Sequence, residues 1–407
     1  MLNMSSKVQT PKGFRDFLPE ASSARAFVLE KIKTTLEKFG FEPLETPALE
    51  FAETLKGKYG EEEKLIFEFT DRGGRQVALR YDQTVPLSRV VSTNTDLPKP
   101  FKRYQIQNVW RAENPQKGRF REFIQVDFDI VGSTSQLADA EVVAAAISVT
   151  ESLGFKNFVV KINDRYTFRG LSAEVVRTID KLTKIGEVRV IEQLKRVGYE
   201  IAEAKSLLKR LKDSPTTKNI NKLFESLAAL KIEADKYAYE PTLARGLDYY
   251  TGLIFELEIE GYSAGSIGGG GRYDDLIKRF SGTQIPATGF SFGFDRIIEA
   301  AKGAKLLPKY FPNSKVLVTI FRENLVKESL SLVSELRNRG VAAEISLETT
   351  DKLDKQLKYA DNKGIAYAII LGPEELKEGT VTLKNLNTRT QSKLKENELI
   401  KKLKSSS

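Results

Sequence analysis

Arg111 and the loop that follows it contain side chains that could bind a phosphate. The stretch VWRAENPQKGRFREF places Arg111 at the end of a predicted strand, with Lys117, Arg119 and Arg121 in the loop before the next strand. A guanidinium presents a planar fork of N–H donors that matches a phosphate, and Phe123 offers an aromatic face on which a base could stack. A solvated hairpin with a basic tip explains the same residues about equally well.

A second polar group lies in LARGLDYYTG, residues 243–252. Arg245, Asp248, Tyr249 and Tyr250 fall within a short segment that leads into a predicted strand. Tyrosine combines an aromatic ring with a hydroxyl, which suits a pocket for a small polar ring. A tyrosine-containing turn that enters a sheet core is the simpler interpretation of this stretch taken alone.

Two glycine-containing stretches follow. GGGGRYD, residues 268–274, lets the backbone approach a ligand closely, but it matches neither the dinucleotide fingerprint nor the phosphate loop. A tight bend in a sheet explains it equally well. GFSFGFDR, residues 289–296, alternates glycine with phenylalanine and brings Arg296 to the start of a predicted helix, where an anion is favoured. An arginine that only packs at this junction is the alternative.

Carboxylates in two further stretches could bind a cationic group. Asp82 stands with Thr84 in LRYDQTVP, and Asp129 stands with Gln125 in FIQVDFDIVG. On a strand, Gln125, Asp127 and Asp129 point to the same side because side chains alternate between the two faces. Two carboxylates could act as a general acid–base pair or could accept the N–H groups of a substrate. If these carboxylates face inward, hydrogen-bond donors must pair with them, since burying an unpaired carboxylate costs free energy.

The composition excludes much of ordinary enzyme chemistry. The 407 residues include no Cys and no His, so disulfides, thiolate metal sites, Ser-His-Asp triads and imidazole ligands are excluded. The net charge of +9 is compatible with a polyanionic partner. No stretch approaches the ~18 consecutive apolar residues of a membrane span, and residues 1–11 lack the layout of a secretory signal. We therefore expect a cytoplasmic protein that does not bind membranes.

The elements around these motifs predict an antiparallel sheet with helices. Apolar residues at helical spacing predict helices over residues 24–39 and 139–155. Alternating or β-branched runs predict strands at residues 65–70, 76–82, 101–113, 121–132 and 249–261, and strand patterns continue in the stretches 266–280 and 287–301. The first two of these runs flank the turn DRGGR and predict a β-hairpin that opens the sheet. A stretch rich in helix formers, about residues 171–234, is interpreted as a helical insertion.

A linker at residues 304–314 precedes a second domain. From residue 315 the pattern alternates strand, helix, strand, helix, strand, which predicts a parallel-type sheet with its own core. The chain is therefore expected to adopt an α+β fold in two domains. The first covers residues 1–314, with the helical insertion at about 171–234, and the second is an α/β domain at 315–407.

The order of the motifs resembles the histidyl-tRNA synthetase family of class II aminoacyl-tRNA synthetases. The resemblance runs from about Thr10 to about Ala300, over TPKGFRDFLP, LRYDQTVP, WRAENPQKGRFREFIQVDFDIVG, LARGLDYYTG, GGGGRYDDL and GFSFGFDRI. It implies a class II antiparallel sheet core and identifies residues 315–407 with the family's α/β anticodon-binding domain. It also implies a histidine–tRNA ligase, which activates L-histidine with ATP to histidyl-adenylate and transfers it to the 3′-terminal adenosine of tRNA(His).

The resemblance further implies a role for each matching residue. Arg111, Arg245 and Arg296 would be catalytic arginines. The implied ATP-binding residues are Arg111, Glu113, Arg119, Phe123 and Arg296. The implied histidine-binding residues are Asp82, Thr84, Arg111, Gln125, Asp129, Arg245, Tyr249, Tyr250 and Tyr273. Mg²⁺ is expected to accompany ATP, without a metal site assigned to side chains. The Pro47 region resembles the family's first motif, which implies a homodimer.

Two other functions are compatible with the same fold. A regulatory paralogue would sense histidine without catalysis, but such paralogues usually lose the RGLDYY stretch and the C-terminal domain, and both are present here. A nucleic-acid-binding module that keeps only the fold would be expected to lose the carboxylate pocket, and Asp82 and Asp129 are in place. The resemblance therefore favours the ATP-dependent ligase.

Overall fold

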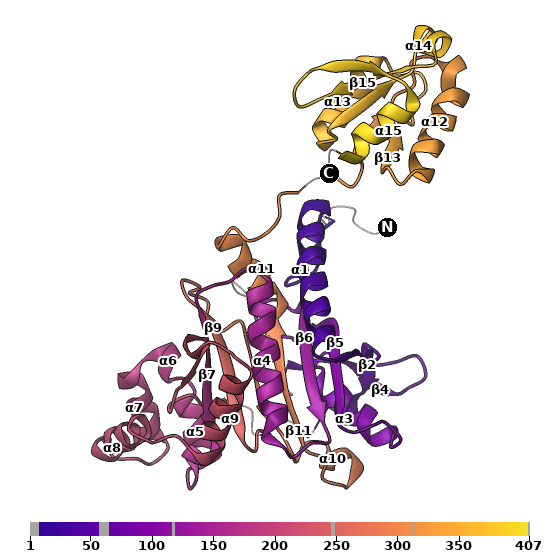
Figure 1. Ribbon diagram of the computed structural model, residues 1–407. Helices are drawn as coiled ribbons and strands as arrows, with labels where there is room; N and C mark the ends of the chain where they lie inside the picture. Colours follow the sequence, from indigo (N-terminus) through magenta and orange to yellow (C-terminus); the bar gives the residue numbers. More distant parts are fainter. Residues whose placement is uncertain (1–7, 57–64, 116–118, 246–248, 311, 406–407) are drawn as a thin grey trace. The chain divides into compact units, whose positions relative to one another are not determined.

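The computed structural model describes residues 8–56, 65–115, 119–245, 249–310 and 312–405 (Figure 1). The chain forms two compact units, Met1–Leu307 and Pro308–Ser407. The division falls within the predicted linker at residues 304–314. Each unit has its own sheet and its own apolar core, and each is described by itself below.

The first unit is built on an eight-stranded sheet with the order β1-β5-β6-β11-β10-β9-β7-β8. Neighbours from β5 to β7 in this order pair antiparallel, and the two outermost pairs are parallel. The strands are β1 (Glu42–Pro43), β5 (Phe101–Trp110), β6 (Glu122–Val131), β7 (Phe158–Asp164), β8 (Tyr237–Tyr239), β9 (Leu253–Ile259), β10 (Gly268–Arg272) and β11 (Ala287–Gly293). The predicted antiparallel core is confirmed.

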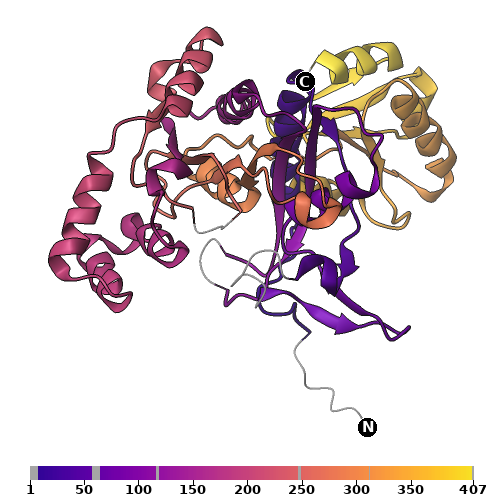
Figure 2. The ribbon, with the colours of Figure 1, turned by 90° about the horizontal axis from the view of Figure 1, so that it is seen from below.

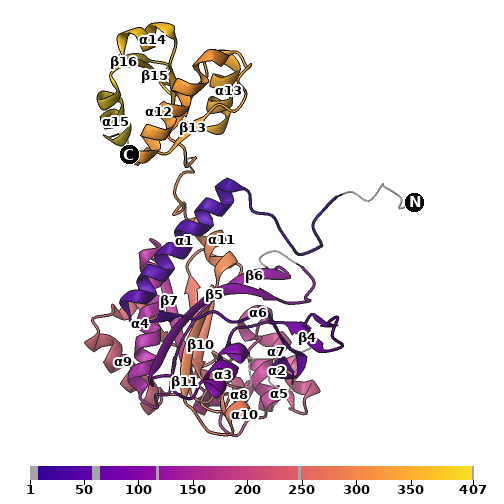
Figure 3. The ribbon, with the colours of Figure 1, turned by 90° about the vertical axis from the view of Figure 1, so that its right-hand side faces the viewer.

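One face of this sheet is covered by helices that supply most of the core. They are α1 (Pro19–Lys38), α4 (Gln136–Ser152), α9 (Lys218–Ala229) and α11 (Phe294–Gly303) (Figure 3). The α4 helix begins after Ser135, whose side chain accepts a hydrogen bond from the Leu137 N–H. The residues of α4 are buried on most sides of the helix. Strand residues such as Phe128 and Phe292 pack into this layer. Apolar side chains therefore cover this face of the sheet.

The opposite face of the sheet carries the polar residues. Because side chains alternate along β6, Val126 and Phe128 point to the helices, and Gln125, Asp127 and Asp129 point the other way. The helices α3 (Thr84–Thr93) and α10 (Lys278–Ser281) and a second apolar cluster border this polar face. The predicted orientation of these three side chains is confirmed.

Two smaller groups of elements complete the first unit. The predicted hairpin forms, but its second strand pairs with β2 in a separate three-stranded sheet instead of opening the main sheet. That sheet and its helix comprise β2 (Leu49–Phe51), β3 (Glu68–Thr70), β4 (Gln76–Leu79) and α2 (Ala52–Leu55). The insertion packs its own apolar residues, among them Val176, Leu194 and Leu208, and its helices gather at one side of the unit (Figure 2). They are α5 (Ala173–Ile179), α6 (Leu182–Ile185), α7 (Glu187–Arg196) and α8 (Ile201–Lys212), between the short 3₁₀ helices η2 (Arg165–Phe168) and η3 (Ala234–Lys236).

The second unit is a five-stranded sheet with the order β13-β12-β14-β15-β16. The first three strands are parallel, as predicted, and the last two add an antiparallel edge. Its elements are β12 (Val316–Val318), η4 (Glu323–Leu325), α12 (Val326–Asn338), β13 (Ala343–Ile345), α13 (Leu353–Lys363), β14 (Tyr367–Ile370), α14 (Pro373–Glu378), β15 (Val381–Asn385), β16 (Gln391–Leu394) and α15 (Glu396–Ser405). Throughout the described ranges, each helix is too short or too polar to pass through a lipid bilayer.

Candidate functional site

Polar side chains of three neighbouring strands form the floor of the site. In the pairing register, Asp129 of β6 lies between Arg103 of β5 and Gly289 of β11. The next row on the same face places Asp127 between Gln105 and Ser291. Glycine at position 289 leaves room for the carboxylate beside it, since a Cβ there would lie 1.8 Å from Oδ1 of Asp129. The sheet therefore presents two buried carboxylates side by side.

A recess lies over this floor and contains most of the predicted histidine-binding residues. It encloses about 240 Å³ of space, part of it open to solvent, and is lined by Thr84, Asp127, Asp129, Tyr249, Tyr250, Gly269, Gly270, Tyr273, Gly289, Phe290 and Ser291. The Tyr273 hydroxyl donates to Oδ1 of Asp129. The Tyr249 hydroxyl donates to that of Tyr250 over 3.3 Å, with the ring centroids 4.4 Å apart. The recess is thus lined by hydroxyls and carboxylates as well as by rings.

Four other residues are predicted to bind histidine: Gln125, Asp82 and the two arginines Arg111 and Arg245. Gln125 donates from Nε2 to Oδ1 of Asp127 over 3.1 Å and to the Ser291 hydroxyl over 2.9 Å. Asp82 precedes α3, and its Oδ1 accepts the backbone N–H of Val85 over 3.3 Å. The charge of Asp82 also acts on the buried Tyr249 hydroxyl. The structure therefore brings the residues from four separate motifs to one place.

The electrostatics of the recess centre on Asp129. The Nη2 atom of Arg103 lies 2.7 Å from Oδ2 of Asp129, and both side chains are almost completely buried. Burial raises the pKa of Asp129 to about 6, with Arg103 opposing the shift and Asp127 adding to it. Burial also raises the pKa of Asp127, and it raises the pKa values of Tyr249, Tyr250 and Tyr273. These phenols are neutral hydrogen-bond donors at neutral pH.

The titration of Asp129 predicts a pH dependence. Because the pKa of Asp129 is raised to about 6, the carboxylate is ionised above that pH and becomes protonated below it. The affinity for a ligand that donates an N–H to this carboxylate is expected to fall about tenfold for each pH unit below the pKa. Calorimetric titration with L-histidine between about pH 5 and 7.5 measures this loss.

The substrate imidazole titrates in the same pH range, so the measurement needs a control ligand. β-(1,2,4-triazol-3-yl)-alanine has a similar shape, and its ring does not take up a proton there. If the triazole analogue keeps a constant affinity from pH 7.5 to 5 while L-histidine does not, the titrating group is the ligand and Asp129 is misassigned.

Of the three predicted catalytic arginines, Arg245 and Arg111 lie beside the recess, and Arg296 lies at the start of α11. Arg245 donates from Nη1 to the Phe255 carbonyl over 3.3 Å and lies against Gly269, which lines the recess. Arg111 follows β5 and donates from Nε to the Tyr81 carbonyl over 3.0 Å, close enough for its charge to act on Asp127. Arg296, in the first turn of α11, donates from Nη1 to the Ser266 carbonyl over 2.6 Å, next to the start of β10.

The residues predicted to bind ATP form two local contacts. The guanidinium carbon of Arg111 lies 5.4 Å from the Phe123 ring centroid, so the two side chains stack. Arg119 donates to the carboxylate of Glu113 over 3.4 Å. Lys117 and Asp248, which belong to the same motifs, lie outside the described residues.

An ion-pair network holds the start of α11, beside Arg296. Asp295 binds Arg25 of α1 over 2.7 Å and Arg15 over 3.0 Å. Arg15 in turn lies 3.2 Å from the ring centroid of Phe120, in the segment after Arg119. These contacts connect the TPKGFRDFLP motif to the loop that follows β5. The motif therefore contacts the surroundings of the site, although it does not line the recess.

Reasoning from the sequence missed Arg103 and left Asp127 without a role. Arg103, Gln105 and Gln107 are polar at every second position of FKRYQIQNVW, the same alternation that identified the acids of β6. The alternation therefore could have placed Arg103 on the site face. It could not show which strand lies beside β5, and the partner of Arg103 depends on that pairing.

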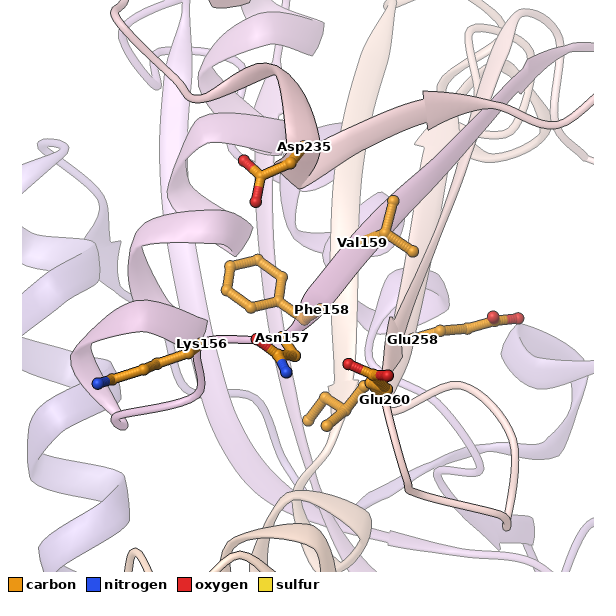
Figure 4. A pocket seen from close by; sticks show the side chains of 8 residues that line it. Lys156, Asn157, Phe158, Val159, Asp235, Glu258 and Glu260 are labelled. Carbon is orange, nitrogen blue, oxygen red and sulfur yellow. The ribbon is translucent and has the colours of Figure 1, made fainter.

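A larger hollow lies elsewhere in the first unit (Figure 4). It encloses about 690 Å³ of space open to solvent and is lined by Lys156, Asn157, Phe158, Val159, Asp235, Glu258, Ile259 and Glu260. Lys156 and Glu258 extend in opposite directions, and Glu258 and Asp235 form ion pairs with Lys161 and Lys236 over 2.6 and 2.8 Å. Its polar groups do not converge, so the smaller recess is the better candidate site.

Comparisons with known proteins agree over both units. A family model described as histidyl-tRNA synthetase matches residues 13–297, and one described as an anticodon binding domain matches residues 315–406. A histidine–tRNA ligase of Gloeobacter violaceus is 40% identical, over 95% of this chain and 96% of its own length. The corresponding protein of Korarchaeum cryptofilum is 38% identical, over 96% and 97%.

Solved structures show the same architecture. The histidyl-tRNA synthetase of Nostoc sp. PCC 7120 superposes with a TM-score of 0.84 at 28% identity, covering 99% of this chain and 100% of that one. A Bacillus halodurans protein described as an ATP phosphoribosyltransferase regulatory subunit/histidyl-tRNA synthetase superposes with a TM-score of 0.72, covering 87% of this chain and 96% of its own. At 23% identity the second likeness concerns the fold alone.

Proposed function

The chain belongs to the histidyl-tRNA synthetase family, and from this premise we propose that the recess over β6 and β11 binds L-histidine and that the arginines around it bind ATP. The chain acts as an ATP-dependent histidine–tRNA ligase, which forms histidyl-adenylate and then histidyl-tRNA(His). The observation that carries the residue assignment is the carboxylate of Asp129, buried in the recess between Arg103 and the Tyr273 hydroxyl. Such a group recognises a polar ring and not a hydrocarbon side chain.

Histidine recognition would divide between the two ends of the substrate. Asp129 accepts a ring N–H, and Tyr250 and Tyr273 enclose the imidazole. Asp82, Thr84 and Gln125 hold the ammonium group, and Arg111 and Arg245 hold the carboxylate. An amino acid with an apolar side chain would leave the buried carboxylate of Asp129 without its N–H donor, so it would be rejected strongly. This assignment needs no histidine or cysteine of the protein.

In the first step the arginines would stabilise developing charge. A carboxylate oxygen of histidine attacks the α-phosphorus of ATP, a P–O bond forms, and the bond to the β-phosphate bridging oxygen breaks, which releases pyrophosphate. Arg111 and Arg245 lie beside the recess and would bind the α-phosphate, whereas Arg296 would bind the γ-phosphate. Preorganised cations stabilise the extra negative charge of the transition state more than that of the bound substrates.

The adenine would be held by Phe123, Glu113 and Arg119, with Arg296 on its other side. In the second step a hydroxyl of the 3′-terminal adenosine of tRNA attacks the histidyl carbonyl carbon, and AMP leaves. Among the described residues there is no group of three or more acidic side chains suited to a metal ion. Mg²⁺ would therefore enter with the phosphates of ATP and neutralise part of their charge.

Amino-acid-dependent ATP–pyrophosphate exchange tests the proposal. We expect exchange with L-histidine, at least about 10⁴-fold less exchange with leucine or phenylalanine, and loss of exchange when Mg²⁺ is chelated. The untagged chain must be used, because it contains no histidine of its own and a polyhistidine tag would add imidazoles. Equal exchange with several amino acids would overturn the assignment of the recess.

The regulatory paralogue remains the second candidate, because the Bacillus halodurans structure shares this fold. It predicts histidine binding without any exchange. The polar recess, its bordering arginines and the second unit favour the enzyme. The second unit would bind the anticodon of tRNA(His), and deletion of residues 315–407 is the direct test for that role. A homodimer and a cytoplasmic location stay predictions, the first of them open to sedimentation analysis.

A further inference from the structure

Arg103 is the largest fully buried side chain of the described residues, and the proposed mechanism does not use it. Its exposed fraction is 0%, and it does not line the recess. Burying a guanidinium costs several kcal/mol unless charged partners compensate. A residue with this cost and no contact with the substrate must act on the residues that do line the recess.

The partners of Arg103 show what it acts on. Nη2 lies 2.7 Å from Oδ2 of Asp129, whereas Nη1 makes only long contacts, 3.4 Å to the Asp127 carbonyl and 3.5 Å to Oε1 of Gln105. Nε and Nη2 have no well-aligned hydrogen bond within the described part of the chain. The guanidinium is therefore held mainly by the charges of the carboxylates beside it and little by directional bonds.

The charges in this part of the site do not cancel. Asp127 and Asp129 are both buried, and their side chains lie two residues apart on the same face of β6. Among the described residues, Arg103 is the cation in contact with them, and the titratable side chains that line the recess with them are Tyr249, Tyr250 and Tyr273, which are neutral. Arg111 acts from the recess border, where the substrate carboxylate would occupy it. With both carboxylates ionised, the described residues of the recess floor carry two negative charges and one positive charge.

We propose that Arg103 is a positioning residue that keeps the recess floor at one net negative charge, so that Asp129 accepts a ring N–H of histidine in a fixed, ionised form. This inference rests on the proposed function of the recess. Without Arg103 the floor would carry two adjacent buried carboxylates, and one of them would take up a proton. Asp129, held by Tyr273 on its other oxygen, would then lose its acceptor role or its position.

A double-mutant cycle tests the charge balance. Arg103→Met leaves two adjacent carboxylates without their cation, so that one of them takes up a proton. Asp127→Asn leaves one carboxylate beside the cation, with a net charge of 0, and the double variant keeps Asp129 as a single carboxylate with a charge of −1. We expect each single variant to raise the KM for L-histidine in pyrophosphate exchange about tenfold or more at pH 7, with the KM for ATP within about twofold. The KM of the double variant for L-histidine is expected to lie within about threefold of that of the wild type. The KM of Arg103→Lys, which keeps the charge, is expected to lie between those of the wild type and Arg103→Met.

The pH dependence of the KM for L-histidine distinguishes a charge effect of Arg103 from a role in packing alone. In Arg103→Met the KM for L-histidine is expected to fall between pH 7 and about 8.5, as the added proton is lost, whereas that of the wild type stays level. Additive effects of the two substitutions, or an Arg103→Met variant with unchanged KM and pH profile, would overturn the inference. If Asp129→Asn itself leaves histidine binding intact, the failure lies instead in the proposed function of the recess.

The absence of histidine from the chain allows a direct spectroscopic test. With ¹⁵N-labelled L-histidine, the ring nitrogens of the bound ligand are the only imidazole signals of the complex. We expect matching ring-nitrogen shifts for the wild type and the double variant and different shifts for both single variants. Shifts that are the same in all four proteins would show that Arg103 and Asp127 do not act on the bound ring. This measurement requires folded protein but no catalysis.

Discussion

Arg245→Ala is expected to abolish histidine-dependent pyrophosphate exchange, with a loss of at least about 10²–10³-fold in kcat. Arg245 lies against Gly269 in the recess wall, where a fixed cation can meet the α-phosphate as charge develops on it. The change should leave the fold intact, because within the described part of the chain the side chain has one long hydrogen bond, to the Phe255 carbonyl, and none that joins two strands of the sheet. Steady-state exchange and circular dichroism measure the two parts of this result.

Two controls make the Arg245 result specific. Arg245→Lys keeps the charge but not the fork of donors, so we expect partial activity. Lys161→Ala removes a cation that pairs with Glu258 of the larger hollow, and exchange should stay within about twofold of the wild type. Near-normal exchange by Arg245→Ala would show that its catalytic role is misassigned, whatever its effect on stability.

Gly289→Ala is expected to raise the KM for L-histidine by about 10²-fold or more. A Cβ at this position would lie 1.8 Å from Oδ1 of Asp129 and 2.9 Å from the Phe128 carbonyl. The carboxylate cannot move aside freely, because Arg103 and Tyr273 hold its two oxygens. Its displacement by even about 1 Å would remove a hydrogen bond that discriminates histidine from other amino acids.

The KM for ATP distinguishes a local effect of Gly289→Ala from general damage. We expect it to change less than about threefold, since the methyl group meets the acid and not the arginines. The matched control is Gly303→Ala in the last turn of α11, where a Cβ meets nothing within 4 Å. This substitution should leave the KM for L-histidine unchanged and should be neutral or slightly stabilising for the fold. If Gly289→Ala binds histidine like the wild type, Asp129 is not the acceptor of the ring N–H.

The local residue pattern was sufficient to predict the strands and the residues on one face of the site. The alternation in FIQVDFDIVG predicts that Gln125, Asp127 and Asp129 share a face, and the pairing of β6 with β5 and β11 confirms it. The alternation in GFSFGFDR likewise puts Gly289 and Ser291 opposite the acids and phenylalanine in the core. These features follow from the alternation of side chains along a single strand, so they do not depend on which other strand lies beside it.

Other features depended on pairing between distant segments. The predicted hairpin joined β2 in a separate sheet, since local propensity does not decide which edge a hairpin meets. Arg103 becomes a partner of Asp129 only through the register of β5 against β6, and a slip of one residue would turn it into the opposite layer. The contact of Arg245 with Gly269 requires β9 and β10 to pair as well.

The sequence by itself determined the chemistry available to this protein. A chain without Cys or His must work with carboxylates, tyrosines and arginines, and the motif order identified the family in which these residues act. Only the tertiary structure decided which charges meet. The energy of a buried carboxylate depends on neighbours within a few ångströms, and in an antiparallel sheet those neighbours come from other strands.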